Sequence, residues 1–304
     1  MDALRASLAG QPAEEAIGEA AGGRSPIRGV DHVLVGVADL EAARQAWLRL
    51  GFLPSPRGRH IGWGTANYCI MFPGDYIELL GIVDRKQFTN NLDRFLERRE
   101  GLLGVAFASD DPAQSAATLR ARGIATKAPK DLSRLIELPG GDARPAFKLL
   151  ELPPETTPAV SAFIVHHLTP ELVWREAWCR HPNGARGLLA VTAVVEDPSA
   201  VAIPYAELFG FDAVLVRDGS VEVDSGGARL VFAAPDALPL VQPGLAAYPV
   251  HPVPWLAGLR LAVESLAATA YYFEQMSVPC RAHNDALLVA PPLANGVILE
   301  FVEG

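Results

Sequence analysis

One pattern recurs four times along this chain and limits its fold more than any other feature. In the first copy, an apolar strand-like run at residues 30–37 precedes a helical pattern that begins after Asp39 and ends at Gly51. Aspartate is a common helix N-cap, and glycine is a common helix end. Three more strand-like runs follow before residue 84. This copy therefore predicts a unit of one strand, one helix and three strands.

The later copies repeat the spacing and the terminal residues of the first. An aspartate and a glycine recur at the same interval at Asp111 and Gly123. The helix of the third copy ends at Gly210–Phe211, a Gly-Phe pair that also ends the first helix. The last strand of the fourth copy carries Glu300 where the first copy carries Glu78. Repetition at this interval indicates an architecture of repeated units.

The repeats divide the chain into two paired units. We expect a flexible lead over residues 1–29, a first domain over 30–167, a connector with a helix and a turn over 168–186, and a second domain over 187–304. The connector helix is predicted to begin at Thr169–Pro170–Glu171, because a hydroxyl N-cap, a proline and an acid favour a helix start. The lead lacks the apolar stretch of a secretory signal.

Composition narrows the class of partner. The chain has 26 basic against 35 acidic residues and no basic run, which argues against nucleic acid or an anionic membrane surface. Its three cysteines are scattered, as expected for a reduced, cytoplasmic protein. No apolar run has the length of a membrane span. We therefore expect a cytoplasmic protein that binds a small-molecule ligand or substrate and that could form a homodimer.

Residues 30–84 resemble the vicinal oxygen chelate superfamily, and most closely its glyoxalase-like domain branch. The resemblance is carried by Asp31–His32 on the first strand, by His60 with the Gly-Thr-Ala-Asn run at residues 64–67, and by Tyr76–Leu79. It implies an α+β fold in which four βαβββ modules pair into two cupped mixed sheets with helices outside. It also implies a divalent metal inside a cup. The reaction stays open, since such sheets host isomerases, dioxygenases, epimerases, thiol transferases and drug-sequestering proteins.

His32 and Glu78 lie on the first and last strands of the first copy. If these strands are neighbours with both side chains inward, an imidazole and a carboxylate converge on the floor of the cup. This pair suits Zn, Fe, Mn, Ni or Co, which bind nitrogen and oxygen donors together. Without metal, Glu78 needs another partner such as His32 or an arginine, because a buried unpaired carboxylate is costly.

The third ligand comes from the second copy in this hypothesis. His166 and His167 end its last strand, and alternation sends one inward and the other outward. We predict that His167 faces the cup and completes a metal site with His32 and Glu78. A bulge would reverse the choice. The alternative is that both histidines simply begin the connector.

A second group of candidate residues lies around His60. We expect His60 and Glu78 to act as acid and base near neutral pH. Thr65 and Asn67 offer a hydroxyl and an amide that could orient a substrate, and Trp63 could form a pocket wall. Alternatively, His60 is an exposed loop histidine, and Trp63 is an ordinary aromatic residue of the core.

The second half offers a poorer site. It has Glu300, but Ala190 or Val191 and Gly258 stand where a two-domain extradiol dioxygenase would need histidines. We therefore expect a glyoxalase-like, metal-dependent small-molecule enzyme, a lyase, isomerase or dioxygenase, with its site in the N-terminal cup. The alternative is a metal-free module of the same fold that binds or sequesters a small molecule.

Overall fold

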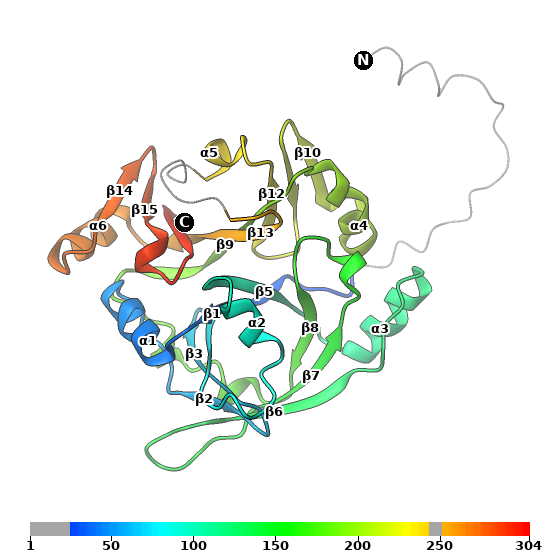
Figure 1. Ribbon diagram of the computed structural model, residues 1–304, viewed down its shortest axis with the longest axis horizontal. Helices are drawn as coiled ribbons and strands as arrows, with labels where there is room; N and C mark the ends of the chain where they lie inside the picture. Colours follow the sequence, from blue (N-terminus) through cyan, green and yellow to red (C-terminus); the bar gives the residue numbers. More distant parts are fainter. Residues whose placement is uncertain (1–24, 243–250) are drawn as a thin grey trace.

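The computed structural model describes residues 25–242 and 251–304, which form two eight-stranded mixed β-sheets with helices packed on them (Figure 1). The predicted α+β fold of repeated units is confirmed. Each unit contributes a strand, a helix and three further strands, and two units make each sheet. Residues 1–24 of the expected lead, which spans residues 1–29, lie outside the described residues.

The first sheet closes into a barrel with the strand order β1-β4-β3-β2-β6-β7-β8-β5. Strand β1 joins the two units, since it pairs parallel with β4 of its own unit and antiparallel with β5 of the next. The barrel strands are β1 (Val30–Val37), β2 (Gly58–His60), β3 (Thr65–Met71), β4 (Tyr76–Ile82), β5 (Gly101–Ala108), β6 (Lys130–Ile136), β7 (Ala146–Glu151) and β8 (Ala162–His167).

The second sheet repeats this arrangement with the order β10-β11-β12-β9-β13-β16-β15-β14 and stays open. Its central strands β9 and β13 pair antiparallel, as β1 and β5 do in the barrel. The strands are β9 (Ala185–Val194), β10 (Val214–Arg217), β11 (Ser220–Val223), β12 (Arg229–Ala233), β13 (Trp255–Val263), β14 (Cys280–His283), β15 (Ala286–Val289) and β16 (Ile298–Glu303).

One longer helix follows the first strand of each unit. These helices are α1 (Leu40–Arg49), α3 (Pro112–Ala121), α4 (Ser199–Phe209) and α6 (Leu266–Gln275), and the shorter α2 (Leu92–Leu96) and α5 (Leu238–Val241) follow the last strands of two units. As the sequence predicts, the carboxylates of Asp39 and Asp111 cap α1 and α3 by accepting backbone N–H groups. No helix in the described ranges is long and apolar enough to span a membrane.

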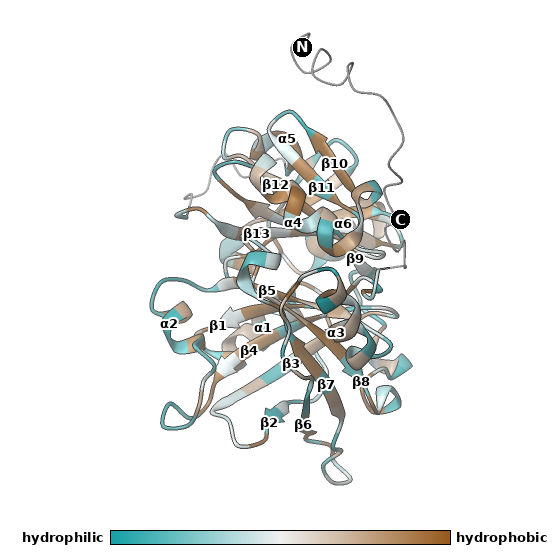
Figure 2. Cartoon of the chain, turned by 90° about the vertical axis from the view of Figure 1, so that its right-hand side faces the viewer, coloured by the Kyte–Doolittle hydropathy of each residue, from teal (hydrophilic) through white to brown (hydrophobic). Residues whose placement is uncertain are grey.

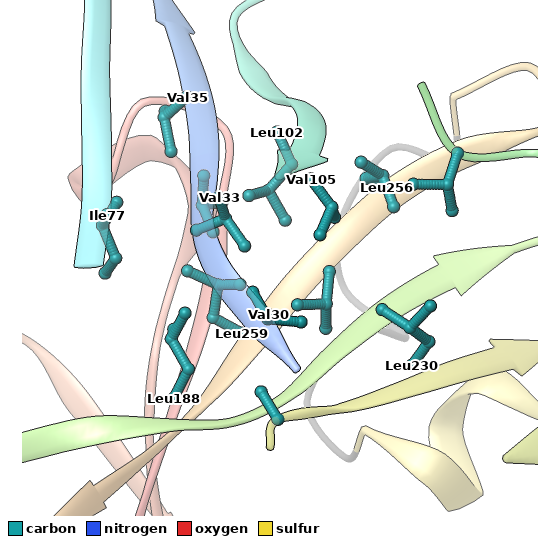
Figure 3. Close-up of a cluster of buried hydrophobic side chains, with 14 of the residues drawn as sticks. Val30, Val33, Val35, Ile77, Leu102, Val105, Leu188, Leu230, Leu256 and Leu259 are labelled. Atoms are coloured by element: carbon teal, nitrogen blue, oxygen red, sulfur yellow. The ribbon is translucent and has the colours of Figure 1, made fainter. Parts of the chain in front are cut away.

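The main core lies where the outer face of the barrel packs against the second sheet (Figure 2). Val33 and Val105 of the barrel and Leu259 of β13 are fully buried, and Figure 3 shows these strands facing one another across the core. Burying side chains of this size contributes about 1.5–3 kcal/mol each. The apolar face of the barrel is thus its outside, which leaves the inside for polar residues.

The connector differs from its prediction. The helix expected to begin at Thr169–Pro170–Glu171 forms two 3₁₀ turns instead, Pro170–Leu172 and Glu176–Trp178. The Thr169 hydroxyl accepts a hydrogen bond from the backbone N–H of Ala146 and so does not cap a helix. The indole Nε1 of Trp174 donates to the backbone oxygen of Phe72 at 3.1 Å. The connector therefore packs against the barrel end that holds His167.

Candidate active site in the barrel

Alternation along the strands gives the barrel a polar interior. On β1 and β4, Val33 and Ile77 point outward into the core, so His32 and Glu78 point inward. The buried polar side chains of this interior are Asp31, His32, Thr65, Asn67, Glu78 and Arg134. Such a set of buried titratable groups gathered inside the barrel is typical of a functional site.

Glu78 is the centre of a polar network in this interior. Its Oε1 accepts a hydrogen bond from the amide of Asn67, and Arg134 Nη1 donates to Asn67 Oδ1 at 2.8 Å. Burial alone would raise the pKa of Glu78, but the charges of His32, His60 and Arg134 and the Asn67 hydrogen bond outweigh burial and lower it. Glu78 is therefore an ionised carboxylate, although only 6 % of it is exposed.

A glycine makes room for this network. Gly58 of β2 pairs with Asn67 of β3, and a Cβ atom at Gly58 would overlap Asn67 Oδ1 and approach Arg134 Nη1 to 2.5 Å. No other residue type fits at this position without moving the amide that holds Glu78. Gly58 and Arg134 were not among the residues predicted for the site.

Asp31 is a third residue that sequence reasoning did not assign to the site. The pairing of β1 with β5 shifts register between Val30 and His32, so Asp31 is the extra residue of a bulge. Its Oδ1 accepts hydrogen bonds from His32 Nδ1 at 2.7 Å and from His167 Nε2 at 3.1 Å. Burial opposes ionisation of this carboxyl, yet the hydrogen bonds from His167 and His32 lower its pKa to about 2.

His167 points inward and His166 points outward, where the His166 ring contacts the backbone oxygen of Ser109. His167 nevertheless lies on Asp31 and makes no ion pair with Glu78. His32 Nε2 is 3.5 Å from Glu78 Oε2, so two of the three predicted metal ligands converge. In the described part of the chain, no group of three His, Cys, Asp or Glu side chains has the arrangement of a metal site. The predicted ligand set therefore does not fit a metal ion.

His60 connects the buried network to solvent. Its Nδ1 lies 2.9 Å from Thr65 Oγ1, and its Nε2 lies 3.9 Å from Glu78 Oε1, which is too long for a hydrogen bond. About 24 % of its side chain is exposed. Burial lowers the pKa of His60 below 6.5, against the charge of Glu78, which raises it. His60 is therefore neutral at pH 7 and can accept a proton.

Two aromatic residues lie on one side of His60, and one of them contacts its ring. The Trp63 ring lies 5.5 Å from the His60 ring and packs edge-on against Phe88 at 5.0 Å. Phe88 is 57 % exposed. Trp63 thus lies at the rim, whereas Thr65 and Asn67 contact His60 and Glu78 inside.

The second sheet pairs its glutamate differently. Glu300 of β16 accepts a hydrogen bond from Arg260 Nε of β13 at 2.7 Å, and Arg260 also donates to the backbone oxygen of Val241. Arg260 lies opposite Glu300 on the neighbouring strand, at the position that Leu34 has opposite Glu78 in the barrel, and Gly258 takes the position of His32. Glu300 has no histidine partner among the described residues.

The family model of a glyoxalase-like domain matches residues 30–209. The chain belongs to this glyoxalase-like domain family. The match covers the barrel, the connector, and the first strand and helix of the second sheet. It includes every residue of the polar interior, and the predicted resemblance to the vicinal oxygen chelate superfamily is confirmed.

Solved structures share the fold of this glyoxalase-like protein at low sequence identity. A hypothetical protein from Staphylococcus aureus aligns with a TM-score of 0.66 and 12 % identity over 90 % of this chain and 99 % of that chain. A mutant of 4-hydroxymandelate synthase from Streptomyces coelicolor aligns with a TM-score of 0.55 and 13 % identity over 92 % and 94 %.

A fusion of a xylose isomerase-like TIM barrel with a 4-hydroxyphenylpyruvate dioxygenase aligns with a TM-score of 0.58 and 14 % identity over 98 % of this chain and 52 % of that chain. No curated protein matches by sequence. At these identities the likeness shows the fold alone.

Proposed function

We propose that the barrel binds a small organic molecule through the end that carries His60 and catalyses proton transfer on it, as an isomerase or a lyase. The observation that supports this proposal most is the ionised, buried Glu78 beside a neutral, partly exposed His60. A neutral imidazole next to a carboxylate is a suitable general base near pH 7.

His60 is the proposed general base. Thr65 fixes its Nδ1, so Nε2 remains available on the side that faces Glu78. In the proposed step, Nε2 takes a proton from a carbon next to a carbonyl group, and the electron pair of the C–H bond forms an enolate. In an isomerase that acts on an unsaturated substrate, the enolate is conjugated with a neighbouring C=C bond, and the imidazolium returns the proton to the far carbon of this dienolate. In a lyase, the electron pair expels a leaving group instead.

The surrounding charges favour this step. Glu78 stabilises the imidazolium that forms on His60, in agreement with the rise that its charge produces in the His60 pKa. Arg134 is buried and carries a positive charge that favours a developing enolate. Asn67 holds Arg134 and Glu78 apart by bonding both, which keeps the two charges from neutralising each other directly.

The metal-free binding module remains the second candidate. It is favoured by the way the polar groups pair with one another: Asp31 bonds two histidines, and Glu78 bonds Asn67. A site of this kind would bind a ligand against the aromatic rim at Trp63 without catalysing a reaction.

Deuterium exchange separates the two candidates. The wild-type protein is incubated in D₂O with a panel of small 2-oxo acids, hydroxy acids and ketones, and exchange at carbon is followed by proton NMR. We expect exchange in at least one compound, at least about 100-fold slower in His60→Gln, as for loss of a general base. His166→Gln is the matched control, because His166 points out of the barrel.

Exchange that persists in His60→Gln contradicts the proposed role of His60. Binding of a panel compound, seen by saturation-transfer NMR, without any exchange would favour the binding module.

A further inference from the structure

A second cavity lies outside the barrel, between the segment that follows α2 and the start of β13. Its volume is about 450 Å³, within the range of small-molecule sites. Phe95, Arg98 and Arg99 line it from the α2 side, and His251 and Trp255 line it from the second sheet. The His251 ring packs edge-on against Trp255 at 4.9 Å.

Positive charge gathers in this cavity without an acidic partner. No aspartate or glutamate is among its lining residues. Among the described residues, neither Arg98 nor Arg99 forms an ion pair with a carboxylate; the Arg99 guanidinium donates to the backbone oxygens of Glu100 at 3.2 Å and Leu102 at 3.1 Å. This is notable in a chain whose net charge is −9.

Arg99 is held in place by its surroundings. Its guanidinium lies 4.7 Å from the centre of the Phe95 ring, a cation–π contact. Burial, together with the charge of Arg98, lowers the pKa of Arg99 to about 10. Two of its five N–H donors serve the backbone oxygens, so three are left for another acceptor.

The rest of the lining is apolar. Leu102, Leu103 and Leu256 join Phe95 and Trp255 around the arginines. We propose that this cavity binds an organic anion, a carboxylate head on an apolar tail, with the head on Arg98 and Arg99 and the tail against the leucines and aromatic rings. Planar guanidinium groups match the two oxygens of a carboxylate and bind them more strongly than neutral groups.

Isothermal titration calorimetry with octanoate tests this site on the full chain. We expect one octanoate per chain, about tenfold weaker binding in Arg98→Gln and a larger loss in Arg99→Gln, in line with the loss of a charge-assisted hydrogen bond. Octanol has the same tail without the charge and should bind at least about tenfold more weakly. Arg94→Gln is the matched control, since Arg94 lies on α2 outside the cavity lining.

Arg98 is exposed, so Arg98→Gln keeps the test valid even if Arg99→Gln does not fold. Absence of octanoate binding, equal binding of octanoate and octanol, or wild-type affinity in Arg98→Gln would overturn the proposal. His60→Gln should leave octanoate binding unchanged, which separates this site from the proposed site in the barrel.

Discussion

Replacing Asp31 by asparagine removes a charge that two buried histidines share. Burial opposes ionisation of Asp31, but the hydrogen bonds from His167 and His32 outweigh it and lower the pKa from 3.8 to about 2. At about 1.36 kcal/mol for each pKa unit, this difference stabilises the folded chain by about 2.4 kcal/mol at pH 7. We expect Asp31→Asn to lose about that much free energy of unfolding.

The loss should depend on pH. Because the folded-state pKa is lowered, the stabilisation is present above about pH 4 and disappears as the pH falls towards 2, leaving about 1.3 kcal/mol at pH 3. Urea unfolding of the wild type and of Asp31→Asn at pH 7 and pH 3 measures the difference directly, and groups common to both variants cancel. A difference that is absent at pH 7, or that stays constant down to pH 3, would refute an ionised Asp31 held by two histidines.

Three further predictions concern the barrel and its edge. Gly58→Ala should destabilise the fold by about 1–3 kcal/mol in urea unfolding, because its Cβ overlaps Asn67, whereas Gly74→Ala in an open turn should be neutral; equal effects would argue against a crowded network. Burial raises the pKa of Asp75 to about 7, against a hydrogen bond from the Leu188 backbone N–H, so the stability of the wild type should fall relative to Asp75→Asn as the pH rises from 4 to 7. Parallel pH curves for these two proteins would disprove that shift. Chelation of divalent metals should leave the rate of deuterium exchange unchanged. Elemental analysis that finds stoichiometric metal in the wild type, and its loss in His32→Ala, would contradict this expectation.

The sequence predicted the fold well because the fold follows from local patterns. The aspartate caps of α1 and α3 recur at the same interval in the first two units, and both helices begin where these caps indicate. Strand alternation also predicted that His32, Glu78 and His167 face inward. The predicted connector helix was wrong. Thr169 looks like a helix N-cap in the sequence, but its hydroxyl accepts a hydrogen bond from the backbone N–H of Ala146.

The partners within the site were harder to predict, since they depend on register. A bulge at Asp31 turns this side chain towards both histidines, and a single sequence does not locate bulges. Arg134 comes from β6 of the second unit, which pairs with β2 of the first unit only when the barrel closes. Residues 130–136 show no regular alternation of polar and apolar side chains, so the sequence alone did not indicate that Arg134 faces inward.

An NMR titration of the seven histidine side chains tests the coupling of His60 and Glu78 most directly. His60→Gln identifies the His60 resonance, and the titration is then run on the wild type and on Glu78→Gln. The account predicts a midpoint for His60 below 6.5 in the wild type and a lower one in Glu78→Gln, because the Glu78 carboxylate raises the pKa of His60. A midpoint at or above 6.5, or one that Glu78→Gln leaves unchanged, would contradict the proposed acid–base pair.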